Sequence, residues 1–71
     1  MISYNPLWKK LIDKNMTKKE LMNETKVSKS TIIKMKHNEF ISLEVINRLC
    51  AFFSCQPNEI IEYKEDDLIN D

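Results

Sequence analysis

One side of a short predicted helix carries side chains that suit the surface of nucleic acid. At about 100° per residue, four residues share that side: Lys29, Ser30, Ile33 and Lys34. Two cations, a hydroxyl and one stiff aliphatic are poor material for a protein core. In the major groove of DNA, lysine can donate to guanine O6 and N7, and an aliphatic side chain can contact a thymine methyl group. We therefore predict that these four residues contact DNA bases.

A second set of side chains suits the sugar-phosphate backbone. The predicted phosphate contacts are Thr17, Lys18, Lys26, Ser28 and Lys36. Ammonium groups, hydroxyls and the free N–H groups of a helix N-terminus all bind phosphate oxygens, which positions a protein on DNA without reading its sequence. The alternative interpretation is that these lysines form only a solvated protein face.

Residues 17–36 are expected to hold these groups on two short helices joined by a sharp turn. Thr17 is followed by Glu20 three residues later, a capping box that opens the first helix. Ser28 is a favourable N-cap for the second helix. Only residues 25–27 remain between them, so the two helices must cross at a steep angle, as in helix-turn-helix units.

The inner faces of these two helices are apolar. Leu21, Met22 and Thr25 share one face of the first helix. On the second helix, Ile32 and Met35 point together, opposite the predicted base contacts. The sequence therefore predicts that the second helix packs on a core and presents its cationic side outward.

This stretch resembles the helix-turn-helix of the Xre/Cro-like phage-repressor family of transcriptional regulators. Aliphatic residues fall where that family buries them, at Leu21, Val27, Ile32 and Met35. The similarity extends over about residues 4–63. It implies an all-α fold, a compact, lambda-repressor-like bundle of about five short helices around a central helix-turn-helix. Two positions depart from the family pattern, because Met22 replaces a small residue and Lys26 replaces a glycine in the turn.

The resemblance also implies a function. It predicts a sequence-specific regulator of transcription that binds double-stranded DNA, here a repressor that acts by occupying its operator. It further suggests a homodimer on a pseudo-palindromic site, with half-sites about one helical turn (~34 Å) apart. The alternative is a helix-turn-helix interaction module, an adaptor or antitoxin-like partner without strong DNA binding, because a fold alone does not decide function.

A first helix is expected before this unit, with Asn5 as its N-cap and Pro6 at its first position. Its amphipathic stripe consists of Leu7, Trp8, Leu11 and Ile12. Trp8 is interpreted as a core anchor, since an aromatic residue among aliphatics at helical spacing usually packs. The alternating residues 1–4 form a possible extended arm that pairs with residues 61–63.

Two more helices are expected after the helix-turn-helix. Ser42 is the N-cap of a fourth helix, whose core face consists of Ile46, Leu49, Cys50 and Phe53. A fifth, short helix is expected from Gln56 and Pro57 to about Ile61.

One flank of the fourth helix lies outside this core face. Val45 and Phe52, seven residues apart, share that flank and are the predicted dimer contacts. The alternative is that Leu68 and Ile69 of the C-terminal tail cover them.

The sequence contains no glycine. Helix ends that need a positive φ must therefore use asparagine or accept strain. Asn15 and Asn38 are predicted at two such ends. At Lys26, the left-handed conformation would cost roughly 1 kcal/mol, because lysine has a Cβ atom.

Length and charge bound the remaining possibilities. Seventy-one residues form one domain, 1–71, with a core at about 4–63 and an acidic tail, 64–71, that is expected to fray. The net charge is zero, but residues 1–38 carry nine lysines against three carboxylates, a balance of +6. Residues 39–71 carry two cations against eight carboxylates, a balance of −6. Such asymmetry indicates nucleic-acid contact by the basic half, which holds the helix-turn-helix.

Other function classes find little support. An enzyme is not expected, because the chain has one histidine and no glycine-rich phosphate loop. No cofactor or metal is expected either. Cys50 and Cys55 have neither the spacing nor the neighbours of a usual zinc site, and buried reduced thiols are favoured over a disulfide. No apolar run suggests a membrane span or a signal peptide, so a cytoplasmic protein is predicted.

Overall fold

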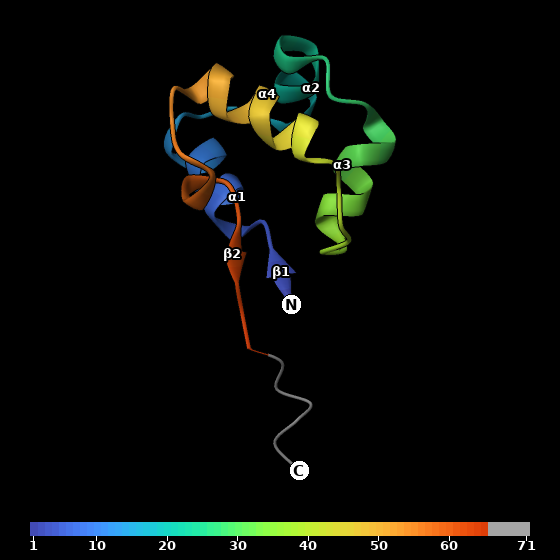
Figure 1. The fold of residues 1–71 in the computed structure, drawn as a ribbon. Helices are drawn as coiled ribbons and strands as arrows, with labels where there is room; N and C mark the ends of the chain where they lie inside the picture. The colour runs from blue at the N-terminus through green and yellow to red at the C-terminus, as the bar shows by residue number, and fades with distance from the viewer. Residues whose placement is uncertain (66–71) are drawn as a thin grey trace.

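The computed structural model describes residues 1–65, which form helices around one core with a small sheet at one end (Figure 1). In chain order the elements are β1 (Ile2–Ser3), α1 (Asn5–Asp13), α2 (Lys18–Thr25), α3 (Lys29–Lys36), α4 (Leu43–Phe53), a 3-10 helix η1 (Pro57–Glu59) and β2 (Glu62–Tyr63). The predicted helical bundle is confirmed in outline. Two details of the predicted fold class are wrong: residues 1–65 contain four α-helices rather than five, and they also contain a sheet.

The two strands lie far apart in the sequence and side by side in the structure (Figure 1). They pair antiparallel, with Ile2 opposite Tyr63 and Ser3 opposite Glu62. The alternation at both ends of the sequence predicted this pairing. The predicted fifth helix is only the single 3-10 turn η1, because the chain must turn into β2 soon after Pro57.

Side-chain caps open three of the helices as the sequence predicts. Thr17 and Glu20 form a complete capping box at α2, with the Glu20 N–H donating to Thr17 Oγ1 at 3.0 Å. Ser42 accepts a hydrogen bond from the Val45 N–H at the start of α4. At α1 the prediction was one residue off, since Tyr4 is the N-cap and Asn5 is the first helical residue. The Asn5 N–H donates instead to Ser3 Oγ at 3.1 Å.

Four residues adopt the left-handed conformation at or just after helix ends, and none of them is glycine. Asn15, Lys26, Asn38 and Ser54 have φ values of 54°, 62°, 58° and 53°. Asparagine at two of these positions, and lysine in the turn after α2, agree with the prediction. Ser54, which ends α4, was not predicted, because serine has no marked preference for this conformation.

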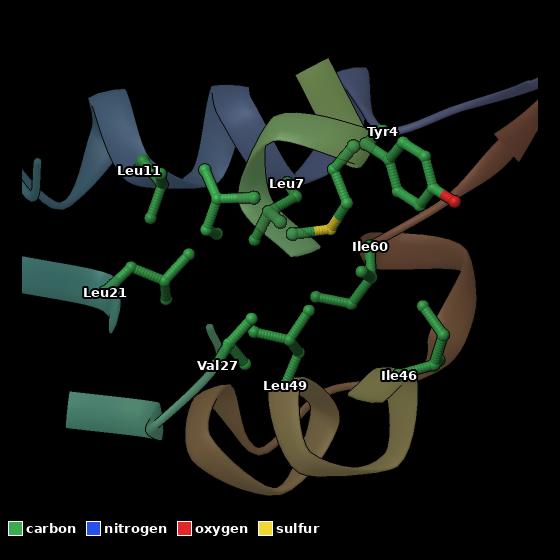
Figure 2. Packing of buried hydrophobic residues seen from close by; sticks show 10 residues of the cluster. Tyr4, Leu7, Leu11, Leu21, Val27, Ile46, Leu49 and Ile60 are labelled. Carbon is green, nitrogen blue, oxygen red and sulfur yellow. The ribbon is translucent and has the colours of Figure 1, made fainter. Parts of the chain in front are cut away.

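The core lies where α1, α2, α3, α4 and η1 meet, and its side chains point toward one another (Figure 2). It consists of Tyr4, Leu7, Leu11, Leu21, Val27, Ile32, Met35, Ile46, Leu49 and Ile60. Each aliphatic residue buried here contributes about 1.5–3 kcal/mol by leaving water. Ile12, predicted in the α1 stripe, is 74% exposed and lies outside this cluster. Among the stripe residues, Ile12 stands furthest around the helix from Leu7 and Leu11, which are buried, whereas Trp8 is half-buried and packs against the core.

Tyr4 ties the N-terminal arm to the chain that leaves α3. Its side chain is buried, and its hydroxyl donates to the Glu39 carbonyl oxygen at 2.6 Å. Burial raises the pKa of the Tyr4 phenol, because the charged form is disfavoured away from water. This contact fixes the end of α3 against the core.

The remaining predictions concern the two cysteines, the C-terminal tail and membrane-spanning helices. Cys50 and Cys55 are free thiols, each half-buried. Leu68 and Ile69, and most of the predicted tail, lie outside the described residues. In residues 1–65, no helix has the length and apolar character needed to cross a membrane.

Candidate nucleic-acid interface

The turn between α2 and α3 is held by hydrogen bonds to its backbone. Thr25 is buried, and its hydroxyl donates to the Leu21 carbonyl oxygen at 2.7 Å. The same hydroxyl oxygen accepts from the Val27 N–H at 3.4 Å. Val27 is itself buried in the core. These contacts fix the turn against the core and so set the direction of α3 relative to α2.

Lys26 stands at the centre of this turn in the left-handed conformation. Its N–H donates to the Met22 carbonyl oxygen at 2.8 Å, and its own side chain is exposed. The Arg48 guanidinium on α4 donates to the Lys26 carbonyl oxygen at 3.3 Å and lies 3.9 Å from a Glu44 carboxylate oxygen. The prediction missed Arg48. The only signal was that Arg48 is the one arginine of the sequence, and a planar guanidinium carries several donors for such bridging.

Helix α3 has the two-sided character that the sequence predicts. Ile32 and Met35 are buried in the core. The four predicted base contacts, Lys29, Ser30, Ile33 and Lys34, are all exposed. Ile33 is 43% exposed, although an aliphatic of this size favours the interior. The helix thus presents two cations, a hydroxyl and an uncovered aliphatic side chain to solvent.

Three hydroxyl groups form a small network at the start of α3. Ser28 Oγ accepts from the Thr31 N–H at 3.2 Å, which caps the helix. It also lies 3.1 Å from Ser30 Oγ and 2.9 Å from Thr31 Oγ1. Since a hydroxyl has one donor and two acceptor sites, the Ser30 hydroxyl keeps capacity for a further partner. The Ser28 hydroxyl, a predicted phosphate contact, is thus hydrogen-bonded to the Ser30 hydroxyl, a predicted base contact.

Lys18 and Trp8 form a pair at the start of α2. The Lys18 ammonium lies 4.8 Å from the centroid of the Trp8 ring. Trp8 is half-buried and packs against the core, so it is both the predicted core residue and a platform for this lysine. An exposed cation–π contact contributes about 0.5–1 kcal/mol and restricts the lysine side chain. Lys18 is thereby held at the N-terminus of α2, next to the exposed Thr17.

The lysines of this unit that are predicted to contact DNA have no acidic partners within residues 1–65. All five are exposed: Lys18, Lys26, Lys29, Lys34 and Lys36. The nearby carboxylate of Glu20 accepts the Thr17 N–H in the capping box. The ion pair between Lys10 and Glu59, at 3.1 Å, lies elsewhere, between α1 and η1. Residues 17–36 hold six lysines and two glutamates, so this unit keeps a net charge of +4.

Sequence comparison assigns this unit to a family. Residues 6–66 match the model of the Cro/C1-type helix-turn-helix DNA-binding domain. The chain belongs to the Cro/C1-type helix-turn-helix family. The predicted resemblance to Xre/Cro-like regulators is thus confirmed, and the match covers the whole of the surface described above.

A solved structure supports the assignment of this Cro/C1-type domain. The crystal structure of the transcriptional regulator VanUg, form II, superposes with a TM-score of 0.86 and is 45% identical in sequence. The similarity covers 92% of this chain and 87% of that chain. Among curated proteins, no sequence matches.

The predicted dimer contacts, Val45 and Phe52, lie on α4. Val45 is half-buried and packs against the core. Phe52 is 39% exposed, and its ring stands edge-to-face on Phe53 with 4.8 Å between centroids. Their role at an interface stays a prediction. Within residues 1–65, no group of three or more His, Cys, Asp or Glu side chains is arranged to hold a metal ion.

Proposed function

We propose that this chain is a sequence-specific transcriptional regulator that binds double-stranded DNA in the cytoplasm and represses by occupying its operator. The observation that carries the proposal is the surface of α3, where exposed cations and one uncovered aliphatic stand opposite a buried apolar side. A helix of this size fits the major groove, which presents a distinct pattern of donors and acceptors for each base pair.

The proposed DNA contacts fall into two groups, those to base edges and those to phosphates. Lys29, Ser30, Ile33 and Lys34 contact base edges and carry the sequence preference. Phosphates are bound by Lys18 and Thr17 at the start of α2, by Lys26 and Ser28 around the turn, and by Lys36 at the end of α3. Trp8 supports the Lys18 contact by holding its ammonium group at the start of the helix.

The regulator acts as a homodimer on a pseudo-palindromic operator. Each chain presents one α3, and a site of two half-sites separated by about one helical turn, ~34 Å, matches two such helices. The similar solved protein, VanUg, is a transcriptional regulator, which supports the same class of function here.

A salt titration of binding to duplex DNA tests this proposal against the adaptor or antitoxin-like alternative. Three predicted phosphate contacts are lysines, so log K should fall with log[salt] with a slope of about −3 per chain. A double variant, Lys29→Ala with Lys34→Ala, should lose preference for the selected site. The matched control, Lys9→Ala with Lys14→Ala, removes the same charge from exposed positions near α1 and should bind as the parent does. Salt-independent or undetectable binding would favour the adaptor.

A further inference from the structure

The two cysteines lie on either side of the point where α4 ends and the chain turns toward η1 (Figure 1). Between them Ser54 adopts the left-handed conformation, with φ 53° and ψ 50°. The Cys55 N–H donates to the Cys50 carbonyl oxygen at 3.0 Å. A hydrogen bond of this kind, closed across a left-handed residue, defines the Schellman motif, in which the side chains of the two bonded residues commonly meet. This helix end therefore brings two thiols together.

The end of α1 has the same arrangement with apolar side chains. The Met16 N–H donates to the Leu11 carbonyl oxygen at 2.9 Å, across the left-handed residue Asn15. The Leu11 and Met16 side chains line one hollow together. Cys50 and Cys55 likewise line one hollow, of about 410 Å³, beside the start of η1. The backbone of such a helix end thus pairs residues five apart in the sequence, and at α4 both members of the pair are thiols.

The Cys50 thiol is close enough to act on the Cys55 thiol. Burial raises the pKa of Cys55, and the Cys50 thiol and the Glu59 carboxylate raise it further. The Lys10 ammonium, which lies 3.1 Å from a Glu59 carboxylate oxygen, has a smaller and opposite effect. No cation in this cluster holds Cys55 as a thiolate, so the reduced form gains none of the stabilisation that makes some dithiols strong oxidants. Both cysteines are half-buried, which leaves them open to a small reagent.

We propose that Cys50 and Cys55 form a modification site, which a low-molecular-weight disulfide, RSSR, oxidises reversibly to an intrachain disulfide. One cysteine loses its proton, and its thiolate attacks one sulfur of RSSR to form a mixed disulfide and release RS⁻. The other cysteine then loses its proton, and its thiolate attacks the protein sulfur of the mixed disulfide and releases the second RS⁻. The two released thiolates take up the two protons. The chain is thus oxidised by two electrons, and RSSR is reduced by two electrons to two RSH.

The backbone at this helix end suits a disulfide. The two Cα atoms of a disulfide lie about 4.4–6.8 Å apart. The path from the Cys50 Cα atom to that of Cys55 runs through the 3.0 Å hydrogen bond and bends at each atom, so standard bond lengths keep the two Cα atoms within that limit. The bond would bridge Ser54, whose Cβ atom disfavours the left-handed conformation, and would hold the last turn of α4 closed. In a reducing compartment a pair of this kind is a redox sensor rather than a permanent cross-link.

Equilibration of the full chain with mixtures of reduced and oxidised glutathione, followed by acid quenching, alkylation and mass spectrometry, tests the proposal. The parent should lose two hydrogen atoms, stay a single chain and take up neither glutathione nor the alkylating reagent. The effective concentration of one thiol at the other should be about tenfold or more higher in the folded chain than in denaturant, because folding has already closed this short loop. The matched controls Cys50→Ser and Cys55→Ser each keep one thiol and should stop at the mixed disulfide with glutathione.

Three outcomes would overturn the proposal. The folded parent could accumulate glutathione on its cysteines without closing the intrachain disulfide, or it could form disulfides between chains instead. The effective concentration could also be no higher in the folded chain than in denaturant, which would mean that the fold does not favour the bond. This last comparison uses only the parent, so it decides the question even if a serine variant is less stable. No DNA is present, so these outcomes are independent of the proposed regulatory function.

Discussion

Replacing Lys26 with glycine should stabilise this protein. Lys26 has φ 62° and ψ 21°, a conformation that costs a residue with a Cβ atom about 1–2 kcal/mol. Glycine removes that cost, but it also gives the unfolded chain more conformational freedom, which reduces the gain in stability by about 0.4–1 kcal/mol. The expected net gain is about 0.5 kcal/mol or slightly more. In a chain of this length, such a gain raises Tm by about 2–4 °C.

Thermal melts of three proteins test this reasoning: the parent, Lys26→Gly and Lys26→Ala. Alanine removes the ammonium group but keeps Cβ, so it isolates the charge from the backbone. We expect stabilisation by glycine and none of that size by alanine. The Arg48 contact is to the backbone carbonyl of residue 26 and is available in all three. A glycine variant that melts below the parent would refute the argument from strain. An equal gain in both variants would assign the effect to the charge.

The same two variants should weaken DNA binding at low salt. Each removes one proposed phosphate contact, so the slope of log K against log[salt] should become less steep by about 1. Binding that is unchanged in both variants would remove Lys26 from the proposed interface without affecting the conclusion about its backbone.

Three further predictions concern single side chains. Lys34→Ala should weaken the free energy of binding to the preferred site by about 1–3 kcal/mol and relax the preference at one base position. Binding-site selection with the parent and with the variant measures this. An unchanged motif would exclude a base contact by Lys34. Lys18→Ala should weaken binding to all duplex sequences about equally and reduce the salt slope, and a sequence-dependent loss in titrations on several duplexes would contradict this. Tyr4→Phe removes the hydrogen bond to Glu39 and should cost about 1 kcal/mol of unfolding free energy. Because burial raises the pKa of Tyr4 above its unfolded value, its contribution to stability is complete below pH ~10 and is lost as the pH rises through the folded pKa. Denaturant melts at a series of pH values should show this loss of unfolding free energy in the parent and a smaller loss in Tyr4→Phe. Equal losses in the two proteins would assign the effect to groups other than Tyr4.

Local features of this fold could be predicted from the sequence because their causes are local. Thr17 with Glu20, and Ser28 alone, act on N–H groups two or three residues away. The two sides of α3 follow from helical periodicity within eight residues. The positive φ of Lys26 was expected from the resemblance, because the Xre/Cro-like family has a glycine at this position of the turn. These features needed no knowledge of how distant parts of the chain pack.

Features that depend on distant contacts were missed or only partly predicted. Periodicity includes Ile12 in the α1 stripe, but where burial stops depends on how the other elements pack against α1. Arg48 reaches the turn from twenty-two residues away, which no local pattern indicates.

Selection of binding sites from random duplex DNA tests the central claim most directly. If the outward side of α3 reads DNA, the full chain should enrich one motif with two-fold symmetry, its half-sites about one helical turn, ~34 Å, apart. The double variant Lys29→Ala with Lys34→Ala should lose or change that motif, while Lys9→Ala with Lys14→Ala should select the same one. Failure to enrich any motif, or an identical motif from the α3 double variant, would contradict the account.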